Sequence, residues 1–187
     1  MEGWIAVIYK NFGSNTDDLE TTQVFRDASA WYHIILVADT TNAVESERIR
    51  IYVNGERVTN FATENYPTQN TPTDVNTQVL HQIGAQLSAT YYSFDGYMAE
   101  IHFLDGYSYG PEFFGETTSN NLWIPKEYTG SYGTNGFKID GRDASDLGDD
   151  ESGNGNDFTT SGLASHDQMA DSPTNNYAVM NVLDTHT

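Results

Sequence analysis

The alternation of apolar and polar residues predicts a chain built from β-strands, because helical periodicity is almost absent. Short apolar runs recur instead, separated by Gly, Asn and Asp residues that favour turns. Residues 31–39 form one continuous apolar run, which predicts a strand covered on both faces. A shorter apolar run at residues 4–9 predicts a buried strand near the start of the chain.

A tight hairpin is the clearest local prediction, and it lies in residues 48–61. From Arg48 to Val53, Ile and Val alternate with Arg and Tyr, as in a strand with one buried face. Asn54-Gly55 follows directly, and these two residue types readily adopt the positive φ angles of a two-residue turn. Residues 56–61 then supply the returning strand.

Two further strands are predicted at residues 77–86 and 94–106. Both alternating sets of the second segment are largely apolar, which indicates a central strand with one face on the core and the other partly covered. Short strands at regular spacing with polar turns are typical of an antiparallel β-sandwich or jelly roll, so the expected fold class is all-β.

The composition changes near Gly115, after which aliphatic residues become scarce and Gly, Asn, Ser, Thr and Asp dominate. We therefore expect a β-sandwich over residues 1–115 and an extended, loop-rich arm or accessory β region over residues 116–187. A short strand is predicted within this region, at residues 136–140. Aromatic residues are spaced through its first part as isolated anchors: Trp123, Tyr128, Tyr132 and Phe137.

The charge balance of 27 acidic to 8 basic residues, net −19, argues against nucleic acid and anionic membrane surfaces as partners. The absence of Cys excludes disulfides, thiolate zinc sites and Cys nucleophiles. The apolar run at residues 4–9 is too short for a signal sequence or a membrane span, so we expect no membrane insertion.

Three segments together resemble the laminin-G/concanavalin A-like jelly-roll superfamily: WYHIILVADTT, RIRIYVNGERVTNF and FDGYMAEIHFLDG. A more specific set of sequence motifs is similar to motifs in virion proteins of tailed bacteriophages, notably marine and cyanobacterial phages. It comprises YPTQN, LDGYSYGPEFFGE, KEYTGSYGTNGF, DESGNGNDF and DSPTNNY. The likeness spans residues 20–180 and implies a domain of a tail fibre or another virion appendage.

This resemblance implies a non-enzymatic structural protein that acts by assembly with other virion proteins and forms homo-oligomers. Family members usually carry several more strands before the WYH segment, which here begins at Trp31. The expected sandwich is therefore trimmed, or it is completed by the C-terminal region or by a neighbouring subunit, because open sheet edges need to be paired or covered.

A catalytic site is not expected from the ionisable residues of the predicted strands. A glycoside hydrolase on this fold needs two carboxylates that flank one bond. The central strands offer only Glu100 and Asp105, whose spacing points them to opposite faces of a regular strand. His33 and His102 have no Ser or Asp partner at a spacing typical of a catalytic group, so both are interpreted as core or edge residues.

The stretch D-x-S-x-N-G that begins at Asp150 follows the first half of a calcium-binding loop. Ser161 stands where an EF-hand needs its bidentate Glu, so an EF-hand is excluded. A simpler calcium site remains open, with oxygen ligands drawn from one set of residues: Asp150, Ser152, Asn154 and Asn156. The favoured alternative is a polar turn, with positive φ at Gly153 and Gly155 and Asx turns closed by Asn and Asp.

Glycan binding is the second predicted function, as a receptor-recognition module for host surface glycans. Sugar sites on jelly rolls combine aromatic platforms with polar loops, and two aromatic runs beside predicted strand ends offer such residues: Tyr91, Tyr92, Tyr107 and Tyr109. The same residue types are common anchors in protein–protein interfaces. We therefore favour assembly over glycan binding for these side chains.

Overall fold

The computed structural model describes residues 8–10, 18–25, 27, 30–79, 81, 83–84, 94, 96–169 and 173. Within this part of the chain the regular structure consists of strands and three short 3-10 helices, η1 (Glu45–Glu47), η2 (Pro111–Phe113) and η3 (Ser165–Asp167). Every strand pair is antiparallel, which confirms the predicted all-β class. No helix in the described ranges has the length and apolar character that crossing a membrane requires.

The predicted hairpin is confirmed at the turn and in its first strand. Strand β3 (Ile34–Ala38) pairs with β4 (Ile49–Val53), and β4 pairs with the short β5 (Glu56–Arg57). Asn54 and Gly55 adopt φ angles of 49° and 83°, as a two-residue turn of this kind requires. The returning strand is shorter than expected and ends at Arg57, although the N–H of Val58 still donates to the Ile51 carbonyl of β4 at 2.9 Å.

A second sheet faces this one and holds β1 (Ile8–Lys10), β2 (Asp18–Thr21) and β6 (Phe61–Asn65), with β2 in the middle. The sandwich core, by which we mean Leu19, Ile49 and Ile51, lies between the two sheets and is at most 1% exposed. Full burial of each such side chain stabilises the fold by roughly 1.5–3 kcal/mol. Strand β1 begins at Ile8, and the rest of the predicted strand at residues 4–9 lies outside the described residues.

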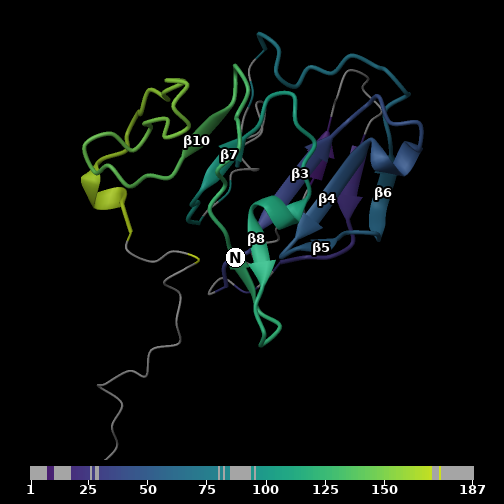
Figure 1. Cartoon of the computed structure of the whole chain (residues 1–187), viewed down its shortest axis with the longest axis horizontal. Coiled ribbons are helices and arrows are strands. Elements are labelled where there is room, and N and C mark those ends of the chain that lie inside the picture. Colours follow the sequence, from purple (N-terminus) through teal and green to yellow (C-terminus); the bar gives the residue numbers. More distant parts are fainter. Residues whose placement is uncertain are drawn as a thin grey trace, which may run out of the picture.

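The second half of the described chain adds two pairs of strands. Strand β7 (Ile101–Phe103) pairs with β10 (Phe137–Ile139), which confirms the strand predicted within residues 136–140. Figure 1 shows β10 and β7 on one side of β3 and β4, with β6 on the other side. Because the β7–β10 pair joins residues from both predicted regions, the loop-rich part is attached to the first by a strand ladder. The boundary at residue 115 stays a prediction.

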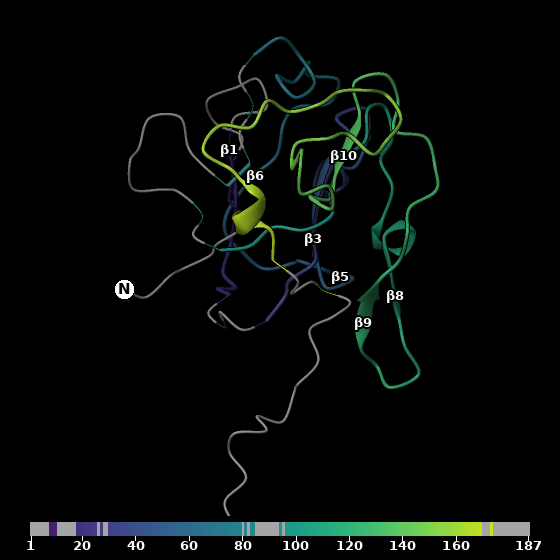
Figure 2. The ribbon, with the colours of Figure 1, turned by 90° about the vertical axis from the view of Figure 1, so that its left-hand side faces the viewer.

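The other pair, β8 (Gly115–Thr117) and β9 (Trp123–Pro125), forms a hairpin that projects from the body in both views (Figures 1 and 2). Trp123 attaches it: the indole Nε1–H donates a 2.9 Å hydrogen bond to Nδ1 of His33. The ring also covers Gly55 so closely that a Cβ there would collide with it. Burial, followed by the nearby His102, lowers the pKa of His33 and so favours the neutral acceptor.

The prediction that residues 31–39 are covered on both faces is wrong. Ile34 and Leu36 of β3 are 43% and 48% exposed, although they share a sheet face with Ile49 and Ile51. The physical reason is position, since β3 is the edge strand of its sheet in the described part of the chain. Leu19 packs over β4 and leaves the neighbouring edge strand open.

The predictions for residues 77–86 and 94–106 are also corrected. The described residues of the first segment form turns and bends rather than a strand. In the second, only β7 is a strand, and it pairs with β10 alone among the described strands, so it is not central. Glu100 has a φ of 53°, a left-handed conformation that interrupts the alternation directly before β7.

Candidate binding site

An aromatic cluster fills one side of the β7–β10 pair, where His102 of β7 lies among three rings. It is stacked on Tyr132 with a centroid distance of 5.9 Å, and Tyr128 meets Tyr132 edge-on at 5.2 Å. Phe114 stacks on Tyr128 at 5.0 Å. Tyr128 and Tyr132 are each 8% exposed, so these residues form one packed cluster rather than the isolated anchors expected from their spacing.

Two of the predicted glycan-binding residues continue this cluster outward. Tyr107 stacks on Tyr109 at 5.2 Å, and Tyr109 stacks on Phe113 at 4.2 Å. Tyr107 and Phe113 are each 40% exposed, so the outer rings of this stack reach solvent. The other two candidates, Tyr91 and Tyr92, lie outside the described residues.

A network of ion pairs surrounds Glu100 on the same side of the strands. Arg142 Nη2 lies 2.9 Å from Glu100 Oε1, and Lys138 Nζ lies between Glu100 Oε2 at 3.8 Å and Asp140 Oδ2 at 3.5 Å. His102 Nε2 is 3.6 Å from Glu100 Oε2. His102 first, and then Arg142 and Lys138, lower the pKa of Glu100 to about 2 against the opposing effect of burial.

The Glu100 network differs from a hydrolase pair. A carboxylate with this pKa is ionised at neutral pH and is unsuited to the role of general acid. The other predicted acid, Asp105, has different partners: its Oδ1 accepts from Asn76 Nδ2 at 2.6 Å and its Oδ2 accepts from the backbone N–H of Asn135 at 3.1 Å. The two carboxylates therefore serve separate hydrogen-bonding groups.

The candidate calcium residues meet in one loop, which we call the Asp150 loop (residues 150–158). Both carboxylate oxygens of Asp150 are occupied by protein donors. Oδ1 accepts the backbone N–H groups of Lys138 and Ser152 at 2.8 and 2.9 Å. Oδ2 accepts the Ser152 hydroxyl at 2.8 Å and the Asn156 N–H at 2.9 Å. Burial raises the pKa of Asp150, but these donors outweigh it, so the net pKa is lowered.

The two Asn residues of the Asp150 loop point their amide groups at the neighbouring turn instead of at a shared centre. Asn154 Nδ2 donates to the carbonyls of Gly133 and Gly136 at 2.7 and 2.8 Å. Asn156 Nδ2 donates to the carbonyls of Thr134 and Gly136 at 3.2 and 2.9 Å. The loop thus holds residues 133–138 in place through side-chain hydrogen bonds, and we call this arrangement the polar staple. The described residues contain no group of three His, Cys, Asp or Glu placed to bind a metal.

The turn interpretation of the same loop is confirmed in its geometry. Gly153 and Gly155 have φ angles of 86° and 71°, in the region that favours glycine. Asp150 closes an Asx turn by accepting the N–H of Ser152 two residues on. The calcium alternative stays a prediction, and a cation would have to displace the donors that now occupy Asp150.

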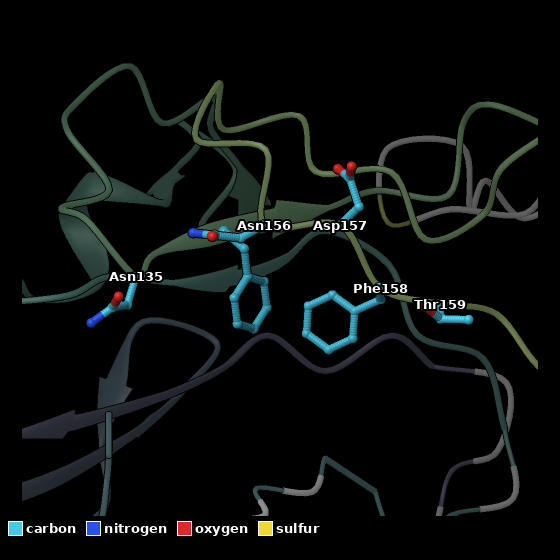
Figure 3. Close-up of a pocket in the computed structure, with 6 residues that line it drawn as sticks. Asn135, Asn156, Asp157, Phe158 and Thr159 are labelled. Carbon is cyan, nitrogen blue, oxygen red and sulfur yellow. The ribbon is translucent and has the colours of Figure 1, made fainter. Parts of the chain in front are cut away.

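A shallow depression of about 470 Å³ lies between β10 and the Asp150 loop (Figure 3). Its lining comes from two segments: Asn135, Phe137, Asn156, Asp157, Phe158 and Thr159. The rings of Phe137 and Phe158 meet edge-to-face at a centroid distance of 4.8 Å, and Phe158 is 48% exposed. The predicted site residues did not include this place, except for Asn156.

The sequence contains a repeated pattern at the two segments that line the depression. Asn135-Gly136-Phe137 and Asn156-Asp157-Phe158 are both Asn-x-Phe triplets. In an extended chain, residues two apart share a face, so each triplet presents one amide and one ring together. Figure 3 agrees: the Phe158 ring lies on one side of its segment and the Asp157 carboxylate points to the other. That the two triplets meet is a consequence of the fold.

Comparison with known proteins gives one family. The family model described as the Concanavalin A-like lectin/glucanases superfamily matches residues 2–108. No curated protein and no solved structure matches the chain. The matched residues cover both sheets around the sandwich core, together with β7, while the depression lies beyond them.

Proposed function

Because the chain belongs to the concanavalin A-like lectin/glucanases superfamily, we propose that it is a non-enzymatic structural protein of a tailed-phage virion, acting through protein–protein assembly. The place we propose is a tail fibre or another appendage, with other virion proteins and further copies of the chain as partners. A binding or structural role fits the family, and the virion setting rests on the resemblance of the phage-type segments.

The observation that carries assembly is the open apolar edge at β3. Ile34 and Leu36 are 43% and 48% exposed, while Ile49 and Ile51 on the same sheet face are 1% and 0% exposed. A partner that covered the two side chains of β3 would remove apolar surface worth roughly 2 kcal/mol from water. Exposed apolar side chains that continue a core are typical of a surface that another chain completes.

The backbone of β3 supports the same proposal. The carbonyl of His33 accepts from Asn54 N–H, and Asp39 N–H donates to the Arg48 carbonyl, so odd-numbered residues bond to β4. The N–H and C=O groups of Ile34, Leu36 and Ala38 therefore point away from β4, and no described strand pairs with that edge. An added strand would satisfy these groups and cover the apolar side chains together.

The charge of the surface supports partners of complementary sign. Each Lys and Arg whose side chain the structure describes is bound within the chain, to a carboxylate or to backbone carbonyls: Arg48, Arg50, Arg57, Lys126, Lys138 and Arg142. With a net charge of −19, the free surface is dominated by carboxylates. Such a surface favours solubility in salty water and docking to cationic partners.

Sedimentation velocity of the purified chain tests the assembly proposal. We expect self-association at micromolar concentration and a shift toward monomer for Leu36→Ser. Leu122→Ser is the matched control, because Leu122 is 63% exposed and belongs to the β8–β9 hairpin rather than to β3. A labelled antibody should mark a tail appendage in electron micrographs of intact particles. Two results together would contradict the proposal: a monodisperse, cooperatively folding monomer in sedimentation, and no antibody labelling of the particles.

Glycan binding is the second candidate, favoured by the exposed stack of Tyr107, Tyr109 and Phe113. Stacked rings that reach solvent beside polar loops can bind a sugar. A glycan array probed with the wild-type chain and with Tyr107→Ala tests this candidate. Binding that Tyr107→Ala abolishes would place glycan recognition ahead of assembly.

A further inference from the structure

The depression between the two Asn-x-Phe triplets has a specific chemical character, which comes from the hydrogen bonds of its amides. We call it the Asn-Phe depression and define it by Asn135, Phe137, Asn156 and Phe158. Asn76 Nδ2 donates to the Asp105 carboxylate at 2.6 Å, so Asn76 turns its oxygen toward Asn135. Asn135 Nδ2 donates to that oxygen at 3.0 Å, so the Oδ1 of Asn135 remains as an acceptor for a ligand.

Asn156 has the same orientation for the same reason. Its Nδ2 donates to the carbonyls of Thr134 and Gly136, which can only accept, so its Oδ1 is the remaining group. Asn156 has thus used both of its amide hydrogens inside the protein, and Asn135 has used one of its two. What the two amides still offer to a ligand is two oxygen acceptors and one N–H of Asn135, beside the rings of Phe137 and Phe158.

A ligand that fits acceptors and ring faces is rich in N–H donors, flat and positively charged. A guanidinium group has five donors in one plane and stacks on aromatic rings. A cation over a Phe ring is further attracted by the quadrupole of that ring. Phe158 is 48% exposed, whereas Phe137 is stacked on Phe103 at 5.4 Å, so Phe158 is the ring that can receive the ligand.

The charge around the Asn-Phe depression has the sign that such a ligand needs. Asp157 lines the depression but directs its carboxylate to the far side, where Oδ1 accepts the Asp150 N–H at 3.1 Å. It therefore acts through its field rather than by contact. Every described Lys and Arg side chain already has a partner inside the chain, so a different protein can supply a cation to the depression more readily than the described part of a second copy can.

From these observations we infer that the Asn-Phe depression receives an arginine side chain of a different protein. This inference rests on the proposed assembly function and names the chemistry of one contact in it. The guanidinium donates to Oδ1 of Asn135 and of Asn156 and lies against the Phe158 ring. Contact with arginine would make the interaction weaken as salt rises.

The test uses N-acetyl-argininamide as the probe and N-acetyl-citrullinamide as its neutral counterpart of the same shape. Each is titrated into the full chain while NMR follows the side-chain amide signals of Asn135 and Asn156. We expect saturable shifts of both signals with the arginine probe. Because the ureido group of citrulline is neutral and has a carbonyl oxygen in place of two N–H donors, we expect binding of the citrulline probe to be weaker by roughly tenfold.

Three variants separate ring stacking from a general loss of structure. Phe158→Leu keeps an apolar side chain and should weaken the arginine probe by roughly fivefold. Phe113→Leu makes the same change in the outer aromatic stack, where Phe113 is 40% exposed, and should leave the affinity unchanged. A Phe158→Tyr variant, which keeps a ring, should bind as the wild type does.

Three results would overturn the inference: no saturable shift, equal binding of both probes, or equal weakening by Phe158→Leu and Phe113→Leu. A fourth would be shifts of the same amides by maltose and not by the arginine probe, which would make the depression a sugar site. None of these results bears on β3, so loss of self-association in Leu36→Ser would still support assembly. Conversely, a monomeric chain that binds the arginine probe would count against the β3 proposal alone.

Discussion

The sandwich core and the Asp150 loop belong to one chain, yet different forces hold them together. The core buries aliphatic side chains, with Leu19 and Ile51 at 0% exposure. The Asp150 loop has almost no aliphatic residues and is organised by the donors around one carboxylate, which is itself 7% exposed. A loop-rich, Gly- and Asn-rich segment can therefore be specified by hydrogen bonds where apolar area is scarce.

The largest effect should come from the core. Ile51→Ala removes buried apolar volume between two sheets, and we expect the free energy of unfolding to fall by roughly 3–4 kcal/mol in urea denaturation. Ile34→Ala is the matched control, because Ile34 shares the sheet face but is 43% exposed. It should cost roughly 1 kcal/mol. Equal losses for both variants would show that β3 is covered in solution.

The next largest effect tests the polar staple. Asp150→Ala leaves the N–H groups of Lys138, Ser152 and Asn156 without their acceptor, and we expect a loss of roughly 3 kcal/mol by the same measurement. Asp143→Ala is the control, since Asp143 closes a similar turn with Ser145 at the surface. It should have a much smaller effect. If the two variants behave alike, the Asp150 loop is not held by its carboxylate.

A smaller effect is expected from pH, through Glu100. Its pKa is about 2 in the folded chain and 4.5 as the ordinary value, so its contribution is present above pH 4.5 and is lost as pH falls toward 2. Because the side chain is 37% exposed, solvent screening reduces this contribution to roughly 1 kcal/mol. Urea unfolding of Glu100→Gln across this window should give a flatter pH profile than the wild type.

Two further details sharpen the pH experiment. Arg142→Gln removes a cation beside Glu100 and so raises the pKa of Glu100 in the folded chain, which should make the loss of stability smaller and complete at a higher pH than in the wild type. His33 has a lowered pKa, so protonation below pH 6.5 destabilises the fold in every variant that keeps it. A profile of Glu100→Gln that matches the wild type between pH 4.5 and 2 would contradict the role of Glu100.

The smallest expected effect is that of calcium. Because protein donors occupy both oxygens of Asp150, millimolar calcium should leave the Tm of the chain unchanged in a thermal melt. Magnesium at equal concentration is the control for ionic strength. A rise in Tm with calcium alone would revive the calcium-binding interpretation of the Asp150 loop and would show that a cation displaces its hydrogen bonds.

Features of short range were predictable from the sequence. The Asn54-Gly55 turn follows from two residue types that tolerate positive φ, and the inward side of β4 follows from its alternation. Gly153 and Gly155 adopt the turn geometry that their position in a polar run indicates. These features depend on neighbours in sequence, so the residues themselves contain the information.

The wrong predictions share one cause: whether a strand is buried depends on segments that are distant in the sequence. The apolar run of β3 is the same whether or not another strand covers it. Nothing in the residues around Glu100 indicates the left-handed φ that interrupts the predicted strand directly before β7. The candidate site was missed for the same reason. Its two Asn-x-Phe triplets are 21 residues apart in the sequence. The carbonyls of Thr134 and Gly136 orient the amide of Asn156, and Asn76 orients the amide of Asn135.

The sequence by itself determined the all-β class, the principal hairpin, the acidic surface and the turn chemistry of the Asp150 loop, because propensity, alternation and charge act locally or additively. Only the tertiary structure decided three other features: the pairing of β7 with β10, the open edge of β3, and the meeting of Phe137 with Phe158. Each of these depends on which surfaces pack together, and burial is a property of the whole fold rather than of any one segment.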